Sequence, residues 1–470
     1  MAIVDHLQPG LGRVGVANRP GRGVLLLFLV TILMPISLEL AGLRLSPTRV
    51  FLLVAILPFA SQVVTGRIGR FTWIDTFFVL YGLWIFVALV MVHGVSQIPF
   101  AGITAVELVG GYFVGRVLIR SLQDYRYVLR FMFFGIMALL PVAIYENFTG
   151  TMVIPDLLRP VFETPTRADS AFGRMGLERT YVVFDHPILW GLFCSLTLSN
   201  FVMAVRRSPA LIVLAILFSV YTTMLSLSSA PLLACSLQLG MLAWGWIMGG
   251  RWKLFLILMV TGYVVVDLLS NRTPITIIIE TLTFNPMSGW VRIAIFDAGW
   301  AAVKGSPIFG IGFNDWVRPS WVTSSVDNFW LLNAMRYGMV GSLFIIAAFV
   351  THLWVLGRAE IADPDVRAVR RGHAIALAGT AFTMVTVHIW GNVSIFVMFY
   401  IGAGAWMYVF DQSAGSVEIS NVSAGREGPR YSRFEPRHRA VPAQTAPAGP
   451  SHARSGRQVT PVPDTTERRT

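Results

Sequence analysis

The sequence predicts an all-α, polytopic membrane protein of about twelve transmembrane helices. Hydrophobic residues make up 55% of the 470-residue chain and charged residues only 13%, whereas a soluble domain carries about 25% charged residues. Apolar runs of about 17 to 25 residues, long enough to cross a bilayer as helices, recur along the chain. The mean hydropathy of +0.64 agrees with this class.

The apolar runs place the predicted spans between residues 24 and 410. The first, 24–40, is taken as a membrane helix because no small-residue cleavage site clearly follows it. In chain order the predicted spans are 24–40, 50–64, 72–92, 101–119, 127–145, 187–205, 210–227, 231–249, 253–269, 330–356, 373–390 and 393–410.

The basic residues predict the orientation, because Lys and Arg are enriched in cytoplasmic loops. If the N-terminal segment 1–23 is cytoplasmic, the short outer loops at 93–100, 228–230 and 391–392 contain neither Lys nor Arg. The inner basic residues are then Arg13, Arg19, Arg22, Arg67, Arg70, Arg116, Arg120, Arg126, Arg130, Arg206, Arg207, Arg251, Lys253, Arg358, Arg367, Arg370 and Arg371. Arg44 and Arg49 in the first outer loop are exceptions. An even number of spans places the C-terminus in the cytoplasm too.

Two outer loops, 146–186 and 270–327, are long and carry arginines that the orientation rule does not explain. Their high content of Trp, Phe, Ile and Pro indicates packed, structured loops, and long loops in compact architectures are often functional. The tail 411–470 is rich in Pro, Ser, Gly, Ala and Arg without an apolar period, which predicts a disordered, basic segment.

The second long loop contains a predicted amphipathic helix at 288–304. Trp290, Ile293 and Trp300 recur at helical spacing, and the indoles suit the headgroup level of a bilayer. A helix held on the surface by lipid phosphates is the simpler alternative to a catalytic role. Gly305-Ser306-Pro307 predicts the end of the helix, and Gly310 and Gly312 allow a tight turn or a close backbone approach.

Several polar residues lie at or inside predicted spans. Pro187 suits the first turn of the sixth span, which places His186 at the membrane edge as a polar cap or a functional group. A charged residue inside a membrane span usually has a function, and Glu107 and Arg336 lie inside predicted spans. The structural alternative is that these two residues form an ion pair with each other. His388 in the eleventh span is similarly open.

Familiar catalytic motifs are absent from the outer loops. The Asp363-Pro364-Asp365 motif is on the inner side and predicts a helix start. The sequence shows no Walker loop, dinucleotide fingerprint or GxSxG motif, and Cys194 and Cys235 lie within apolar spans. A reaction at the outer face would therefore need a substrate that arrives already activated, and no metal or other cofactor is expected.

Four motifs carry a resemblance to a known family. They are Arg179-Thr-Tyr-Val-Val-Phe-Asp-His-Pro187 with Gly191; Ser226-Leu-Ser-Ser-Ala-Pro231; Arg292 with Trp300 and Pro307-Ile-Phe-Gly-Ile-Gly312; and Asp327-Asn328-Phe-Trp-Leu with Tyr337-Gly338. In order and spacing they resemble the O-antigen ligase and polymerase superfamily of bacterial envelope proteins over residues 24–410. The resemblance implies a GT-C-like glycosyltransferase that uses an undecaprenyl-diphosphate-linked glycan at the periplasmic face of the inner membrane.

The resemblance also implies roles for individual residues. Arg179 and Arg292, followed by Arg174, Arg318 and Arg336, are expected to bind the leaving diphosphate, because guanidinium groups pair bidentately with phosphate. Asp327 or His186 is expected to act as the base, although relatives often carry His at the position of Asp327. Asn328, Trp300 and Glu178 are expected to contact the glycan or the acceptor.

The motifs do not identify the acceptor of the glycan. A polymerase of O-antigen or exopolysaccharide repeat units is the preferred hypothesis, and a ligase that transfers the glycan to lipid A-core is the alternative. Two alternatives are not glycosyltransferases: a polysaccharide transporter or flippase, and a non-catalytic scaffold for polysaccharide assembly. The expected partners are the lipid-linked glycan, an acceptor glycan lipid, the membrane and proteins of polysaccharide export or chain-length control, but no nucleic acid.

Overall fold

The structure of the protein is a computed structural model that describes residues 21–40, 43–167, 173–174, 176–270, 277 and 286–410. The segment before residue 21, the loop residue Arg272 and the predicted tail 411–470 lie outside the described residues.

The described residues are mostly helical, and nine of their helices are long and apolar enough to cross a membrane. The prediction of a helical, multi-pass membrane protein is confirmed at this level. The nine are α3 (Pro47–Val64), α4 (Trp73–His93), α5 (Ile98–Leu118, preceded by the 3-10 turn Val95–Gln97), α6 (Leu122–Thr149), α8 with α9 (Pro187–Ser195 and Leu198–Ala204), α11 (Ser229–Ile247), α12 (Trp252–Leu269), α15 (Phe329–Arg358) and α17 with α18 (Gly391–Gly404 and Trp406–Val409).

Three other predicted spans are also helical but fall outside this set of nine. Two of them, α2 (Arg22–Ile32) and α10 (Pro209–Met224), are apolar but short, and α16 (Pro364–Thr383) begins with a charged segment. The side chain of Asp363 accepts a hydrogen bond from the backbone N–H of Asp365 at 2.7 Å, so the predicted helix start at this motif is confirmed.

Two predicted spans have different ends from those expected. The first span was predicted over 24–40, but α2 ends at Ile32, because Pro35 cannot continue a helix. The following residues form a hairpin of β1 (Leu38–Leu40) and β2 (Leu43–Leu45), in which Glu39 pairs with Arg44. The eleventh span was predicted to reach residue 390, but α16 ends at Thr383, so His388 lies in the loop before α17.

The core of the bundle is the contact between α5 and α17. Every residue of α17 from Val393 to Gly404 is buried. A Cβ at Gly111 would lie 2.2 Å from the carbonyl oxygen of Ile395, and a Cβ at Gly115 equally close to that of Phe399. Small residues four apart therefore let the two backbones touch, as in many membrane helix pairs.

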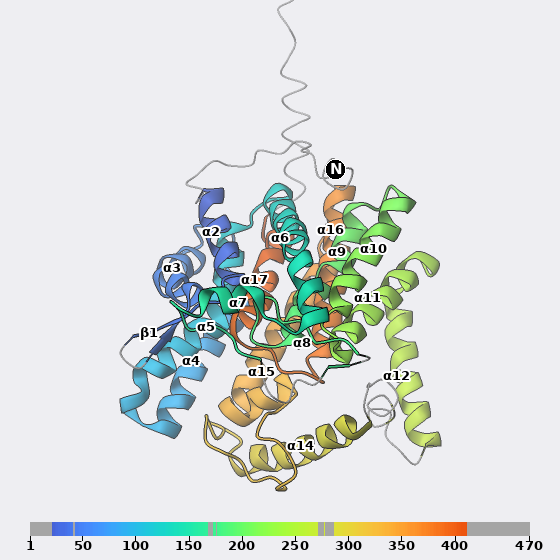
Figure 1. Cartoon of the computed structure of the whole chain (residues 1–470). Helices are drawn as coiled ribbons and strands as arrows, with labels where there is room; N and C mark the ends of the chain where they lie inside the picture. The colour runs from blue at the N-terminus through green and yellow to red at the C-terminus, as the bar shows by residue number, and fades with distance from the viewer. Residues whose placement is uncertain are drawn as a thin grey trace, which may run out of the picture. The chain divides into compact units, whose positions relative to one another are not determined.

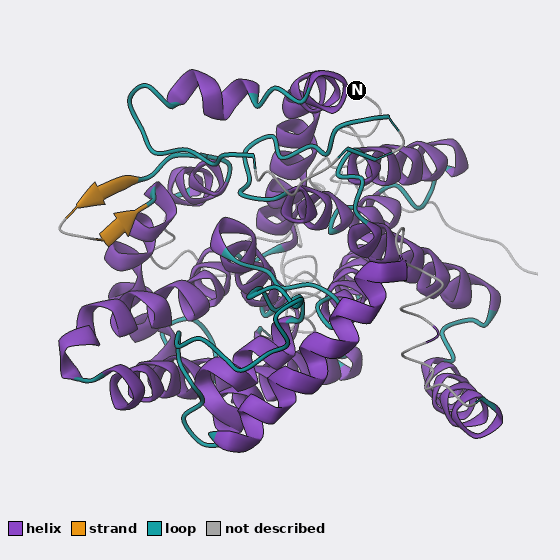
Figure 2. Cartoon of the chain, turned by 60° about the horizontal axis from the view of Figure 1, so that its bottom comes forward, coloured by secondary structure: helices purple, strands orange, loops and turns teal. Residues whose placement is uncertain are grey.

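The described part of the second long loop, residues 286–327, packs against the bundle. α14 (Pro286–Gly305) lies across one end of the bundle, and α12, which has no buried side chain among its residues, stands at the side (Figure 1). The β1–β2 hairpin projects at the edge of the same bundle (Figure 2). A separate hydrophobic cluster joins α14, the loop 306–328 and the start of α15; it contains Ile295, Val303, Trp316, Val322, Val326, Leu331, Leu332, Ala334 and Met335.

Candidate functional site

The loop after α14 is docked into a kink of α15. The kink is at Gly338, whose φ of 71° and ψ of 177° break the helix. A Cβ at Gly338 would lie 1.8 Å from the carbonyl oxygen of Ile308, so the loop can approach only a glycine. Three backbone hydrogen bonds join the two segments: Ile311 N to Met335 O (2.7 Å), Gly312 N to Arg336 O (3.1 Å) and Met339 N to Pro307 O (2.8 Å). The close approach predicted for this glycine-rich turn is confirmed.

The first long loop is held by a buried carboxylate. Glu146, at the end of α6, accepts hydrogen bonds from the backbone N–H groups of Tyr181 (3.0 Å) and Val182 (2.9 Å) and lies 3.3 Å from a guanidinium nitrogen of Arg167. Since Glu146 is completely buried, these bonds place the segment after Arg179 against the bundle.

The same region stores backbone strain. Among the described residues other than glycine, positive φ angles occur at Val182 (57°) and Leu227 (45°), a conformation that costs branched residues on the order of 1–3 kcal/mol. Arg174 donates to the carbonyl oxygen of Leu227 at 2.7 Å, and Arg179 donates to Oγ of Ser228 at 2.9 Å. The turn 226–231 of the second motif thus supports both Arg179 of the first motif and Arg174, which precedes that motif.

These segments enclose a cavity of about 1020 Å³. It brings together six of the residues singled out in the sequence: Arg174, Arg179, His186, Arg292, Asp327 and Arg336. They come from the first loop, from α14 and from the segment of α15 and its N-terminus that precedes the kink; Ser229 and Gly312 line the same space, so all four motifs contribute to it. We call this space the cationic cavity.

The guanidinium groups of the cationic cavity are crowded and incompletely paired. Arg179 is only 8% exposed, and burial, followed by repulsion from Arg174, lowers its pKa to about 10. Burial, followed by repulsion from Arg292, also lowers the pKa of Arg174. Within the described ranges, the Nε atoms of Arg179 and Arg292 are buried without a hydrogen-bond partner. Buried donors of this kind call for an acceptor, and the surrounding charge favours an anionic one.

One carboxylate opposes this charge. Burial raises the pKa of the Asp327 carboxyl, and the nearby Arg292 opposes this effect in part. Burial likewise lowers the pKa of Arg292, and the nearby Asp327 opposes that effect in part. Asp315, which also lines the cavity, is instead paired with Arg318. Asp327 therefore compensates only part of the positive charge.

His186 caps α8, which confirms one of the two roles considered for it. Its Nδ1 accepts a hydrogen bond from the backbone N–H of Ile188 at 3.2 Å. Burial, followed by repulsion from Arg179 and Arg174, lowers its pKa to about 4, so the ring is neutral at physiological pH. A neutral ring that accepts at Nδ1 carries its proton on Nε2, and this side of the ring is suited to donate a hydrogen bond.

Four of the expected site residues lie outside the lining of the cationic cavity. Asn328 caps α15 by accepting from the backbone N–H of Leu331 at 3.0 Å. Arg318 pairs with Asp315, and Glu178 lies 3.4 Å from a nitrogen of Arg167. Trp300 is exposed on α14, where its ring is parallel to that of Phe296.

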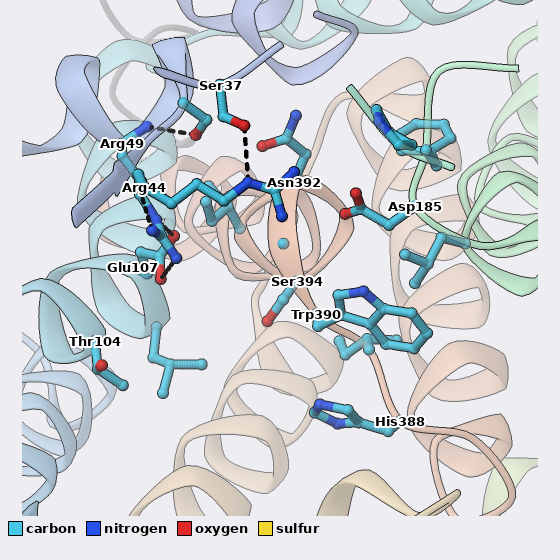
Figure 3. A pocket seen from close by; sticks show the side chains of 18 of the residues that line it. Ser37, Arg44, Arg49, Thr104, Glu107, Asp185, His388, Trp390, Asn392 and Ser394 are labelled. Atoms are coloured by element: carbon cyan, nitrogen blue, oxygen red, sulfur yellow. Dashed lines mark hydrogen bonds and ion pairs between the residues drawn. The ribbon is translucent and has the colours of Figure 1, made fainter. Parts of the chain in front are cut away.

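A second cavity, of about 320 Å³, adjoins the first (Figure 3). Phe313, Arg336, His388 and Trp390 line both spaces. Its polar lining consists of Ser37, Arg44, Ser46, Arg49, Thr104, Glu107, Asp185, Asn392 and Ser394. We call it the neutral cavity, because its lining carries the carboxylates of Glu107 and Asp185 beside its arginines, and Arg44 and Arg49 each have a carboxylate partner.

The charge pairing in the neutral cavity differs from the pairing considered in the sequence. Glu107 pairs with Arg49, not with Arg336. Arg44 donates to Oγ of Ser37 at 2.7 Å and lies 3.7 Å from Glu163. The two arginines that broke the orientation pattern thus each have a carboxylate partner, Glu107 within the cavity lining and Glu163 outside it.

Trp390 was not singled out in the sequence, and the role of His388 was left open there. Trp390 lies with its ring centroid 5.6 Å from that of His186 and 5.7 Å from that of His388. Within the described residues, Nδ1 of His388 is buried without a partner, and burial, followed by Arg336, lowers the pKa of its ring to about 3. The density of polar and aromatic residues in His388-Ile-Trp-Gly-Asn392 was the signal that could have identified this segment.

No protein-family model matches the chain, and no curated protein matches it. Within the described ranges, no group of three or more His, Cys, Asp or Glu side chains is arranged to hold a metal ion.

Proposed function

We propose that the protein is an inner-membrane glycosyltransferase that takes a glycan from an undecaprenyl-diphosphate carrier at the periplasmic face and transfers it to an acceptor hydroxyl. The observation that carries this proposal is the meeting of Arg174, Arg179 and Arg292 in one cavity, two of them with an unpartnered buried Nε. A diphosphate would supply the acceptors that the Nε atoms of Arg179 and Arg292 lack, and the negative charge that the cluster attracts.

The chemistry needs such a cluster. As the bond from the sugar to the diphosphate breaks, negative charge gathers on the leaving group. Cationic donors that are already in place stabilise that charge without reorganising, and removal of one such donor typically costs about 10²–10³-fold in rate. Arg179, supported by Ser228, and Arg292, opposite Asp327, are held in this way.

The position of α14 suits a lipid-linked donor. Trp290, Phe296 and Trp300 are exposed along this helix, and aromatic side chains of this kind settle at the membrane interface. Arg292 is on the same helix but lines the cationic cavity. A polyprenyl chain could thus stay in the bilayer while its diphosphate reaches the arginines.

Purified full-length protein in nanodiscs tests the diphosphate site. We expect undecaprenyl diphosphate to bind, and we expect Arg292→Lys and Arg179→Lys each to weaken binding and to lower transfer at least tenfold, because a point charge does not replace a bidentate fork. Arg159→Lys is the matched control, since Arg159 is exposed in the same loop and pairs with Asp156 at 2.8 Å. Wild-type activity in both arginine variants would refute the proposal.

The acceptor requires a cellular experiment. We prefer a polymerase of repeat units, with a ligase to lipid A-core as the alternative. After deletion of the gene, single-repeat products on a gel of lipopolysaccharide and secreted polysaccharide would indicate a polymerase. Long lipid-linked glycan without lipid A-linked chains would indicate a ligase. Product formation in detergent micelles, which have no compartments, would exclude a transporter or flippase.

A further inference from the structure

The two adjoining cavities differ in charge although they share a wall. In the neutral cavity, Arg49 is paired with Glu107 and Arg44 with Glu163. Asp185 adds a second carboxylate to this lining, where Arg44 and Arg49 act on it, and Arg336 lies at the boundary of the two spaces. An anionic ligand gains less from such a lining than from the cationic cavity, whereas an uncharged molecule with many hydroxyl groups can use its donors and acceptors.

The lining also offers the contacts that a saccharide needs. Oγ of Ser394 is buried in this cavity and, among the described residues, has no hydrogen-bond partner. Trp390 presents an aromatic ring at the boundary, and sugar rings pack on such faces. An unpartnered hydroxyl, an indole and the carboxylate of Asp185 thus surround one small space (Figure 3).

Asp185 is held next to the boundary. A Cβ at Gly391 would lie 3.2 Å from Oδ2 of Asp185, so the carboxylate lies against the backbone beside Trp390. It faces Arg44 across the cavity (Figure 3). Asp185 is exposed, so its carboxylate is accessible from the cavity, and partial desolvation by the surrounding protein raises its pKa, an effect that Arg44 and Arg49 oppose in part. A carboxylate with a raised pKa is a stronger base than one in water.

We propose that the neutral cavity binds the acceptor saccharide and that Asp185 accepts the proton of its attacking hydroxyl. This inference rests on the proposed function. In a single displacement, the acceptor attacks the anomeric carbon from the side opposite to the leaving group. The neutral cavity would then hold the acceptor on one side of that carbon, and the cationic cavity the diphosphate on the other.

The acceptor hydroxyl gives its proton to a carboxylate oxygen of Asp185, and its oxygen forms the new bond to the anomeric carbon of the donor. The bond from that carbon to the diphosphate oxygen breaks, and the electron pair stays on the diphosphate in the cationic cavity. Asp185 then releases the proton to water.

Two variants with matched controls test this assignment in the full-length protein. Asp185→Asn is paired with Asp156→Asn, which removes an exposed carboxylate of the same loop. Thr104→Trp fills the neutral cavity and is paired with Thr149→Trp. Both threonines donate to the carbonyl oxygen four residues earlier at 2.9 Å, and Thr149 is exposed outside the cavity. The probes are undecaprenyl diphosphate and the free saccharide released by mild acid from the lipid-linked pool of the deletion strain.

We expect Asp185→Asn to lower transfer at least 100-fold, in line with the usual contribution of a general base, and to leave the Kd for undecaprenyl diphosphate within about twofold of wild type. Asp185→Glu should restore part of the rate. Thr104→Trp should weaken binding of the free saccharide at least tenfold, whereas Arg292→Lys should leave it unchanged. The two control variants should behave as wild type.

The possible failures are distinguishable. If the wild type does not bind undecaprenyl diphosphate and transfers no glycan, the proposed function itself is refuted. If undecaprenyl diphosphate binds but the free saccharide does not, or if Thr104→Trp binds it as well as wild type, the neutral cavity is not the acceptor site. Wild-type transfer by Asp185→Asn, or loss of diphosphate binding in this variant, would refute the role of Asp185.

Discussion

Asp185 and His186 are consecutive in the chain, yet they line different cavities. The backbone at His186 is extended, with φ −157° and ψ 146°, and successive side chains of an extended segment point in opposite directions. His186 therefore faces the arginines, while Asp185 faces the space that Arg44 and Asn392 line. The segment, together with Trp390, forms the partition between the two cavities.

The charge of Asp327 provides one prediction. Asp327→Asn removes the carboxylate that opposes Arg292, so we expect the affinity for undecaprenyl diphosphate to rise severalfold at low salt and the difference to shrink as salt screens the charges. Binding isotherms at two ionic strengths measure this. A fall in affinity would mean that Asp327 orients Arg292 more than it neutralises it.

Glu146 provides a second prediction, on stability. Glu146→Ala leaves the N–H groups of Tyr181 and Val182 without their acceptor, and each buried unsatisfied group costs about 1–3 kcal/mol. We expect a lower midpoint of thermal unfolding and weaker diphosphate binding. Glu146→Gln keeps one accepting oxygen and should lose less. Equal midpoints for the two variants would contradict this account.

The kink of α15 provides a third prediction. Gly338→Ala places a Cβ 1.8 Å from the carbonyl oxygen of Ile308 and strains a positive φ, which alone costs on the order of 1–3 kcal/mol. Undocking of the loop 307–312 should abolish diphosphate binding. Gly357→Ala in the same helix is the control, because a Cβ there meets nothing within 4 Å. Its unfolding midpoint should not fall.

The fourth prediction concerns pH. The pKa of His186 is lowered to about 4 in the folded protein, against about 6.5 in the unfolded chain. Between these values the unfolded state binds more protons, so the stability that His186 retains above pH 6.5 is lost as the pH falls towards 4. The loss is roughly 1–3 kcal/mol.

His186→Asn isolates this contribution, since Asn also caps helices well and does not titrate. We expect the unfolding midpoint of the wild type to fall more between pH 7.5 and 5 than that of the variant. The other buried histidines titrate in both proteins and cancel in the comparison. Parallel pH curves would show that His186 is not neutral in the fold.

The local features of this protein were predictable from the sequence. The apolar runs identified the segments that became helices, although Pro35 ended α2 earlier and α16 is displaced towards its charged start. The helix of Trp290 and Trp300, its stop at Gly305 and the caps at His186 and Asp363 followed from neighbouring residues. Such features depend on spacing and on turn chemistry within a few residues.

The site needed the tertiary structure. The motifs named the arginines, but the partners that place them lie far away in the chain: Ser228 for Arg179, and Arg49 instead of Arg336 for Glu107. Asn328 and Arg318 looked equally suitable in the sequence and turned out to cap a helix and to pair with Asp315. The sequence by itself determined which segments form apolar helices, because hydropathy is a local property. The division of the polar residues between two cavities was decided by long-range packing around Gly338 and Trp390.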